Sequence, residues 1–571
     1  MPDPILPLPI APLPEVMVPR PLRELRREAR RIDGWGPIAW RETHGWWRLP
    51  GGLLGIEPSL SVIERGDGDE LSVTLVSDAL PREPWRNREP VAWCDWCWRQ
   101  AVAAVGDLPE RQRDRLRLAA PTAAVRATTS ATLWQDPAGN DRLVLRLGLR
   151  PPYAGMGCDG QRFLALVAVL QTMLAQATDP RRAKARASHA RAVAVQRALR
   201  ERLDEFGLCA FIGCGALIAR DGQVLGGADR PDPRCRPFDP ADQAMTIDLG
   251  RLGKISGLGL RHGVTALIGA PYHGKSTLLQ ALAAGAEDHP PGDGRELVVT
   301  HRDSVVIQAE DGRLVHSTDL SAVFARLPGA NPMRFTTRRA SGATSMAAGA
   351  LQAAAAGCRM LLIDEDSAAN NALAIDPGMR QLLGSDLDGT TTLVELLPAL
   401  AAQGCACVLA VGSASGILAH CDRVLRVRDF QVSDATTAAR KVVPRASLRE
   451  LTAPRRHLSG DPEALFRQRH VLDLDLDEPE RPRIDGTYLD LRRAGFLLDP
   501  ALARGALIAA ALCCRLANGG CDLRELRQRW LAFAAERGAT GLDPWHREPV
   551  TLPPWMLVAA VLERLPRVVL G

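Results

Sequence analysis

Residues 264–285 have the sequence VTALIGAPYHGKSTLLQALAAG, in which an apolar run is followed by a glycine-containing turn and a second apolar run. Within it, residues 269–277 (GAPYHGKST) fit the pattern G-x-x-x-x-G-K-[ST]. That pattern requires a strand before the turn and a helix after it, and the two apolar runs provide both. The stretch therefore predicts a phosphate-binding loop in an α/β layered fold.

The residue types in this loop suit phosphate chemistry. Gly269 and Gly274 allow backbone N–H groups to turn toward phosphate oxygens without a Cβ in the way. The following helix directs its positive N-terminal end at the same anion. Lys275 would reach the terminal phosphates and Ser276 would bind Mg²⁺. The predicted nucleotide-binding loop comprises Gly269, Ala270, Tyr272, His273, Gly274, Lys275, Ser276 and Thr277. The alternative is a chance glycine-rich turn before a helix.

A second stretch, residues 359–371 (RMLLIDEDSAANN), ends an apolar run in acidic residues. The run indicates a buried parallel strand. Asp364 at its end could hold Mg²⁺ directly or through water, and Glu365 could orient the attacking water. An apolar run followed by acids often marks only a strand entering solvent. Because this stretch follows the phosphate loop in the same predicted domain, we favour the functional role of the two acids.

A third stretch, residues 339–349 (RASGATSMAAG), places Ser341 and Gly342 before an alanine-rich helical run. One interpretation is that these small residues only cap the N-terminus of a core helix. The other is a signature loop, because ABC ATPases carry a Ser-Gly pair before a helix at this distance from the acidic strand. In those proteins the pair contacts the γ-phosphate of the nucleotide bound by the partner subunit.

Several sequence segments together resemble those of a family of predicted ABC-class ATPases. They are GVTALIGAPYHGKSTLLQALAAG (263–285), PPGDGRE (290–296), IQAEDGR (307–313), ASGATS (340–345) and LLIDEDSAANN (361–371). The resemblance covers about residues 200–430. It implies a P-loop NTPase with an ABC-type core, ATP and Mg²⁺ as ligands, and a head-to-tail homodimer that holds two ATP molecules between its subunits.

The chain departs from that family at two points. Gln308 stands where the family tends to have Arg. Residues 411–418 (VGSASGIL) stand where the family tends to have the motif Gly-Gly-Ser-Gly-Asp-Tyr. Ordinary ABC ATPases place a switch histidine near the second point, but none is present there. We therefore expect Gln308 to contact nucleotide and Ser413 to lie near the γ-phosphate.

A chain of 571 residues is too long for one hydrophobic core, so we expect several domains. The predicted fold class is α/β, a P-loop NTPase core with an α+β N-terminal domain and a helical C-terminal region. The boundaries are a Pro-rich tail (1–19), the N-terminal domain (20–245), the ATPase domain (246–432) and the C-terminal region (433–571). Strands are expected at 70–76 and 142–148 because apolar and polar residues alternate there.

The compartment is predicted from cysteines and apolar runs. Thirteen Cys without secretory spacing, and no signal-like segment after Met1, predict a cytoplasmic protein. The apolar run near residues 506–514 is shorter than the ~20 residues of a membrane helix, so no membrane association is expected. Cys94 and Cys97 are interpreted as buried residues rather than zinc ligands because no second pair accompanies them.

Residues 181–203 form a predicted basic helix with eight Lys or Arg and one Glu, although the whole chain has a net charge of only +5. A solvated helix face is the favoured interpretation, and a contact with RNA or DNA phosphates is the alternative. Three functions remain open: an ATPase coupled to nucleic-acid handling, a nucleotide-gated interaction switch with little turnover, and a transporter motor subunit.

Overall fold

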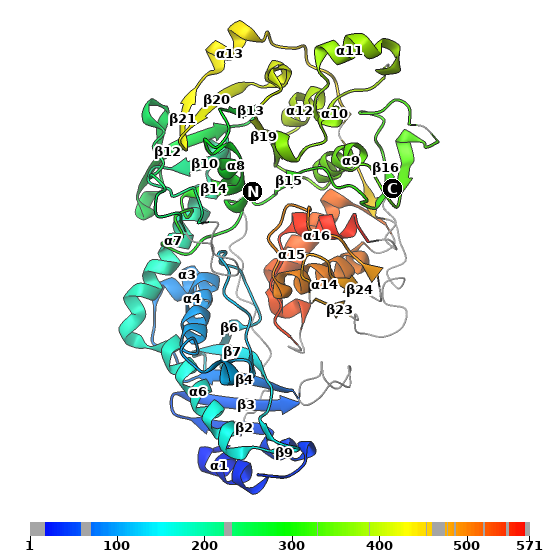
Figure 1. Cartoon of the computed structure of the whole chain (residues 1–571). Helices are drawn as coiled ribbons and strands as arrows, with labels where there is room; N and C mark the ends of the chain where they lie inside the picture. The colour runs from blue at the N-terminus through cyan, green and yellow to red at the C-terminus, as the bar shows by residue number, and fades with distance from the viewer. Residues whose placement is uncertain are drawn as a thin grey trace. The chain divides into compact units, whose positions relative to one another are not determined.

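The structure is a computed structural model of the chain (Figure 1). It describes residues 18–58, 70–221, 231–327, 329–387, 389–452, 454–458, 474–476, 478–484, 487–517, 520–543 and 548–565. Residues 1–17 of the predicted Pro-rich tail lie outside the described residues. The chain forms two compact units, of which unit 1 contains Val195–Ala532 and Pro553–Gly571 and unit 2 contains Pro4–Ala194 and Phe533–Leu552. These units divide the chain at other places than the domain boundaries predicted at residues 245 and 432.

Unit 2 contains a seven-stranded sheet of order β1-β2-β3-β4-β7-β5, with β6 also paired to β7. The strands are β1 Arg20–Pro21, β2 Gly45–Leu49, β3 Gly52–Pro58, β4 Leu71–Ser77, β5 Leu116–Arg117, β6 Ala131–Gln135 and β7 Asp141–Leu149. Its main helices are α1 Leu22–Arg31, α4 Pro90–Ala103, α6 Gly160–Thr178 and the first part of α7 Ala183–Glu201. The strands predicted at 70–76 and 142–148 are confirmed as β4 and β7.

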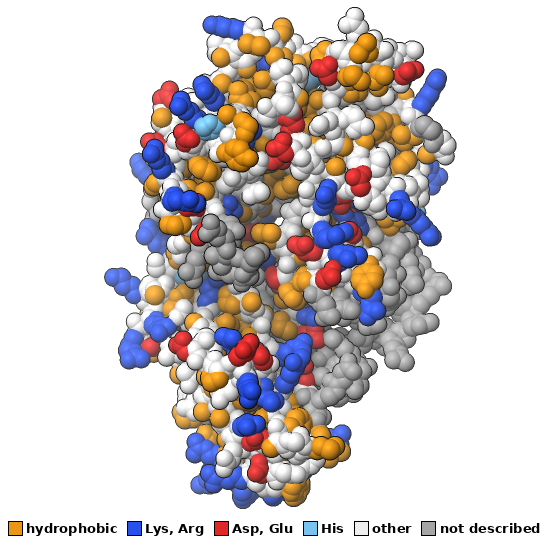
Figure 2. Space-filling model, viewed as in Figure 1, with side chains coloured by type: hydrophobic (Ala, Val, Ile, Leu, Met, Phe, Trp, Pro, Cys, Tyr) orange, Lys and Arg blue, Asp and Glu red, His pale blue; other side chains and the backbone are white. Residues whose placement is uncertain are grey.

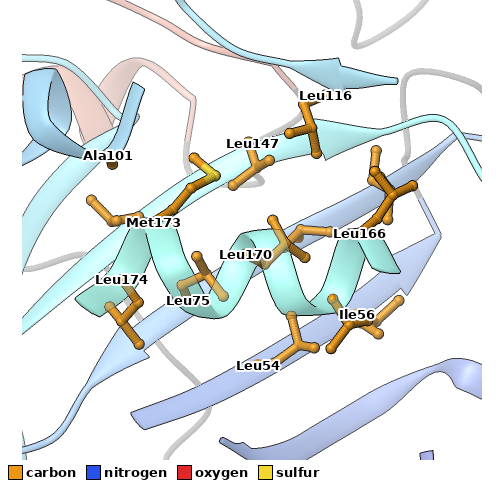
Figure 3. Packing of buried hydrophobic residues seen from close by; sticks show 14 of the residues in the cluster. Leu54, Ile56, Leu75, Ala101, Leu116, Leu147, Leu166, Leu170, Met173 and Leu174 are labelled. Carbon is orange, nitrogen blue, oxygen red and sulfur yellow. The ribbon is translucent and has the colours of Figure 1, made fainter. Parts of the chain in front are cut away.

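The core of unit 2 lies between this sheet and α6. Leu166, Leu170 and Met173 of α6 pack in one buried cluster with Leu54, Leu75 and Leu147 of the sheet (Figure 3). The continuous helical stretch Gly160–Glu201 is long and apolar enough to cross a membrane by length and composition alone. Part of that apolar character serves the core, because one face of α6 is buried against the sheet.

The cysteine pair of α4 belongs to this same core. Cys94 and Cys97 are buried among the tryptophans of α4, as the sequence analysis favoured. Burial raises the pKa of both thiols, so they are protonated near neutral pH. Enclosed in this way, the two side chains pack as small apolar residues of the core.

Unit 1 contains a six-stranded sheet of order β15-β18-β19-β13-β20-β21 (Figure 1). The strands are β13 Val264–Ile268, β15 Ser304–Ile307, β18 Met360–Asp364, β19 Ala406–Val411, β20 Arg423–Arg428 and β21 Gln431–Asp434. All neighbours are parallel except β20 and β21. The strands expected before the phosphate loop and before the acidic residues are confirmed as β13 and β18. Helices α8 Lys275–Ala284, α9 Gly342–Ala355 and α12 Leu393–Ala402 connect and flank the strands.

A four-stranded antiparallel sheet and the C-terminal helices complete unit 1. The sheet has the order β11-β12-β10-β14. Its strands are β10 Leu208–Gly213, β11 Ala244–Asp248, β12 Lys254–Arg261 and β14 Val298–Thr300. The C-terminal helices of this unit are α14 Pro500–Leu516, the first part of α15 Leu523–Leu542 and α16 Trp555–Leu562. The indole N–H of Trp555 donates to the carbonyl of Ala356 (2.8 Å), so α16 is fixed beside the end of α9.

The second half of α7 enters unit 1 through a buried ion cluster. Asp288 is fully buried and accepts hydrogen bonds from Arg197 (2.9 Å), Arg200 (2.7 Å) and Arg302 (2.8 Å). Burial alone would raise the pKa of the Asp288 carboxyl, but the three guanidinium groups hold it well below its ordinary range. The carboxylate is therefore charged throughout mild acid, and its guanidinium partners tie α7 to the segment before β14.

Asp288→Asn should destabilise unit 1 strongly. Removing one partner of a buried ion cluster leaves uncompensated charge and costs about 3–5 kcal/mol. Chemical denaturation followed by circular dichroism would measure the loss. Asp232→Asn is the matched control, because Asp232 pairs with Arg234 at the surface and its loss should change little. Equal unfolding midpoints for wild type and Asp288→Asn would contradict this role.

Candidate nucleotide-binding site

The predicted phosphate loop connects β13 to α8. The loop packs closely on the β20–β21 hairpin: a Cβ on Gly269 would lie 2.3 Å from the carbonyl oxygen of Val427, and one on Gly274 would lie 2.3 Å from the ring of Phe430. Gly274 also has a φ of 96°, a conformation that side chains disfavour. Both positions therefore need glycine. Tyr272 adopts a φ of 65° and is fully exposed, so the loop holds strained backbone at its tip.

Lys275 begins α8 and folds back over the loop. Its ammonium group donates to the carbonyl oxygens of Gly269 (2.8 Å) and Ala270 (3.2 Å). Helix α8 has no side-chain cap at Gly274, so the N–H groups of its first turn are not satisfied by a capping side chain. A positive helix end beside an ammonium group fits a phosphate ligand. Ser276 and Thr277 are half-buried in that first turn.

His273 fastens the loop to the hairpin. Its Nδ1 lies 3.0 Å from the Asp429 carboxylate, and its carbonyl accepts the N–H of Phe430 (3.1 Å). Asp429 and Phe430 form the turn between β20 and β21, and both have positive φ, 50° and 63°. His273 thus positions the phosphate loop through this contact, whereas Tyr272 projects into solvent.

The acidic residues lie at the same sheet edge as the loop. Strand β18 ends at Asp364, which pairs with Ala410 of β19, and Ile268 of β13 pairs with Val411. Because β19 lies between β18 and β13, residues 412–414 follow it between the two predicted motifs. Asp364 is half-buried and accepts the N–H of Asp366 (3.2 Å), while the side chain of Asp366 is exposed. This is the edge at which α/β sheets bind ligands.

Glu365 is buried, and both of its carboxylate oxygens are held by the loop after β19. One oxygen accepts the N–H groups of Gly412 (2.6 Å) and Ser413 (3.0 Å). The other accepts the hydroxyl of Ser413 and the N–H of Ala414 (3.0 Å). Burial acts to raise the pKa of Glu365, but these four hydrogen bonds outweigh it and hold the pKa below its ordinary value. The structure therefore brings Glu365 and Ser413 together and keeps the carboxylate ionised.

The other predicted residues lie elsewhere in unit 1. Ser341 is exposed and caps α9 by accepting the N–H of Thr344 (3.3 Å), with Gly342 as the first helical residue. Gln308 follows β15 and donates to the carbonyl of Arg493 (3.1 Å). Within the described part of the chain, no hydrogen bond links Ser341, Gly342 or Gln308 to Lys275 or Glu365.

The basic helix at 181–203 corresponds to α7 and its flanking turns. Arg186 and Arg200 are buried, and Arg197 binds Asp288. Much of the positive charge counted in the sequence is therefore neutralised inside the protein. Arg181 and Arg182 are exposed at its start. On the face shown in Figure 2, basic and acidic side chains are interspersed.

Comparison with known families settles the class of this core. The model of the ABC_ATPase family, described as a P-loop domain, matches residues 182–461. Those residues are an ABC_ATPase P-loop domain. The ABC class and the P-loop NTPase fold expected from the sequence are thereby confirmed. The matched range includes the phosphate loop, the acidic strand and the 412–414 loop that binds Glu365.

Two curated proteins resemble parts of the chain that contains this ABC_ATPase domain. The uncharacterized protein MJ1628 of Methanocaldococcus jannaschii is 32% identical over 213 residues, or 35% of this chain and 46% of that protein. The xylose import ATP-binding protein XylG of Pseudomonas fluorescens is 27% identical over 146 residues, 24% of this chain and 25% of that protein. The matched region spans less than half the length of either relative.

Among solved structures, one described as the ATP-binding subunit of an ABC transporter matches 33% of this chain and 85% of its own. Its sequence identity is 17% and its TM-score is 0.20.

Proposed function

We propose that the chain binds Mg-ATP at the ABC_ATPase loop 269–277 and hydrolyses it. The observation that carries the proposal is the ionised Glu365 carboxylate, held by the loop after β19 at the sheet edge where the phosphate loop begins. The family match to an ABC_ATPase P-loop domain supports nucleotide binding. A helix end without a side-chain cap and the ammonium of Lys275 supply the positive charge that phosphates require.

Each residue has a chemical role in this proposal. Ser276 and Asp364 would hold Mg²⁺, which neutralises phosphate charge when bound. Lys275 would exchange the carbonyl oxygens of Gly269 and Ala270 for phosphate oxygens, where it stabilises the charge that develops during water attack. Glu365 would orient the attacking water through its carboxylate.

Glu365 cannot perform that role while four donors occupy its carboxylate. The hydrogen bonds from residues 412–414 use the positions at which a water would be bound. In the proposed cycle, nucleotide binding loosens this loop and frees one oxygen of Glu365. The same observation favours a second candidate function, a nucleotide-gated switch with little turnover, if the loop does not release the carboxylate.

A homodimer is part of the proposal. Ser341 is exposed at the N-terminus of α9, where a second subunit's nucleotide could reach it. The chain carries one phosphate loop and one Ser-Gly signature, so a complete ATP sandwich needs two copies. Light scattering of Glu365→Gln with and without Mg-ATP tests this point. A mass that stays monomeric with bound ATP would contradict it.

Turnover of Mg-ATP by the purified chain is the decisive measurement for the function. Phosphate release that requires both Mg²⁺ and the intact phosphate loop supports the ATPase. ATP binding without release supports the switch instead. We further propose that nucleic acid couples to the ATPase through the basic segment 181–203. Addition of RNA or DNA tests this, with Arg181→Glu/Arg182→Glu as the variant because both side chains are exposed in the turn before α7.

Ser413→Ala should increase turnover by about tenfold, with little change in KM. A hydrogen bond to a charged group is worth about 1.5–3 kcal/mol, so its loss makes release of Glu365 easier. The lost donor also raises the pKa of Glu365, since that hydroxyl stabilises the ionised form. The acid limb of the pH–rate profile should therefore move to higher pH. Ser415→Ala, two residues further along at an exposed position, is the control. Lower turnover in Ser413→Ala would show that the hydroxyl promotes catalysis.

A further inference from the structure

The four-stranded sheet of unit 1 collects three possible metal ligands at one end. Strand β10 lies between β12 and β14 and is antiparallel to both. The chain therefore leaves β12 at His262 and β14 at His301 beside the start of β10. Asp204 lies in the turn just before β10. Topology alone thus brings one carboxylate and two imidazoles together.

Their spacing is that of ligands around a metal ion. Asp204 Oδ1 lies 3.4 Å from Nε2 of His262 and 3.3 Å from Nε2 of His301. The three ligand atoms all lie within 4.8 Å of one another. Hydrogen bonds of this kind are typically about 2.7–3.2 Å long, so both distances exceed them. Bonds of about 2.0–2.1 Å to a tetrahedral zinc ion place neighbouring ligands about 3.3–3.4 Å apart.

We propose that Asp204, His262 and His301 bind one divalent transition-metal ion of the Zn²⁺ type. Imidazole nitrogen and carboxylate oxygen suit this class of ion, and three protein ligands leave one position for water. Backbone contacts hold the ligands in place before metal binds: the N–H of His262 donates to the carbonyl of Gly207 (3.2 Å), and that of His301 donates to Cys209 (3.4 Å).

Arg359 competes with the metal for this site. Its Nη2 lies 2.6 Å from the same Asp204 Oδ1 and 3.4 Å from Nε2 of His301. A guanidinium and a metal ion cannot both contact that oxygen at short distance, because their positive charges repel each other. The Arg359 side chain is 38% exposed, so it has room to move to the other carboxylate oxygen. Arg359 therefore lowers the affinity of the site for metal.

The site is separate from the nucleotide. Strand β13 begins at Val264, close after His262, and its five residues extend about 17 Å to the phosphate loop. Metal binding at the start of the strand therefore does not depend on the proposed ATPase activity. Lys275→Ala should bind metal as wild type does, which separates a failure of this inference from a failure of the proposed function.

Cobalt titration of the tag-free, EDTA-treated full chain tests the inference, with Zn²⁺ added in competition. One equivalent of Co²⁺ per chain should give tetrahedral d–d absorption without thiolate charge-transfer bands, since the ligands are nitrogen and oxygen. His262→Asn should weaken binding at least about tenfold, because even outer-shell changes cost about 10–100-fold. Its side chain is one-third exposed, so this variant disturbs packing less than one at buried His301.

Two further variants complete the test. Arg359→Ala should bind Co²⁺ about tenfold more tightly, because the competing cation is gone. His457→Asn, at an exposed histidine in the same unit, should bind as wild type does. The inference is overturned if wild type lacks a one-equivalent site, if thiolate bands show cysteine ligation, or if His262→Asn leaves binding unchanged. It is also overturned if Arg359→Ala weakens binding.

Discussion

Glu365→Gln should lower ATP turnover by about 10²–10⁴-fold while ATP binding persists, because general-base catalysis contributes on that scale. The carboxylate lies at the sheet edge beside the phosphate loop and is kept ionised by its hydrogen bonds. Phosphate release measured under single-turnover conditions, together with ATP binding by calorimetry, would report the two effects separately.

The same substitution should also destabilise the nucleotide-free protein. Both oxygens of Glu365 accept hydrogen bonds, so the amide of glutamine would place its NH₂ group against two donors of the 412–414 loop. An unsatisfied buried donor costs about 1–3 kcal/mol. Glu365→Asp is the useful companion, because it keeps the charge and shortens the side chain. If Glu365→Gln turns over ATP at the wild-type rate, Glu365 only anchors the loop.

The phosphate loop, the acidic strand and the ABC class could be predicted from the sequence. Each depends on residues that are neighbours in sequence, so the local pattern specifies the structure. An apolar strand is followed by glycines, which the close packing of the loop requires, and by a helix that begins at Lys275. The helix expected at residues 181–203 is confirmed as α7 with its flanking turns, and Val195, Leu199, Leu203 and Phe206 belong to one hydrophobic cluster.

The surroundings of Glu365 could not be predicted in the same way. Three of its four donors are backbone N–H groups, and any residue type except proline at 412–414 would supply them. Only Ser413 could be singled out from the sequence, because its side-chain hydroxyl is a hydrogen-bond donor. Charge counting also failed to separate surface from interior along α7, because it could not show that Arg200 points at buried Asp288. Asp204, His262 and His301 are far apart in sequence, so their proximity depends on strand pairing alone.

Lys275→Ala should weaken ATP binding by about 10–100-fold, since a charge-assisted hydrogen bond is worth about 1.5–3 kcal/mol and each 1.4 kcal/mol is tenfold. Turnover should fall as well, because Lys275 would stabilise charge on the phosphates as water attacks. Calorimetric titration with Mg-ATP measures the affinity. Lys254→Ala is the matched control, because Lys254 is exposed in the same unit and makes a surface ion pair with Asp248.

The nucleotide-free fold should tolerate the loss of Lys275. Its ammonium group donates to the carbonyl oxygens of Gly269 and Ala270, and its side chain is half-buried, so water can replace those bonds. An unchanged unfolding midpoint without ATP, combined with loss of the stabilisation that ATP gives wild type, would place the effect on phosphate binding. Equal ATP affinity in Lys275→Ala and wild type would mean that the loop at 269–277 does not bind the nucleotide phosphates.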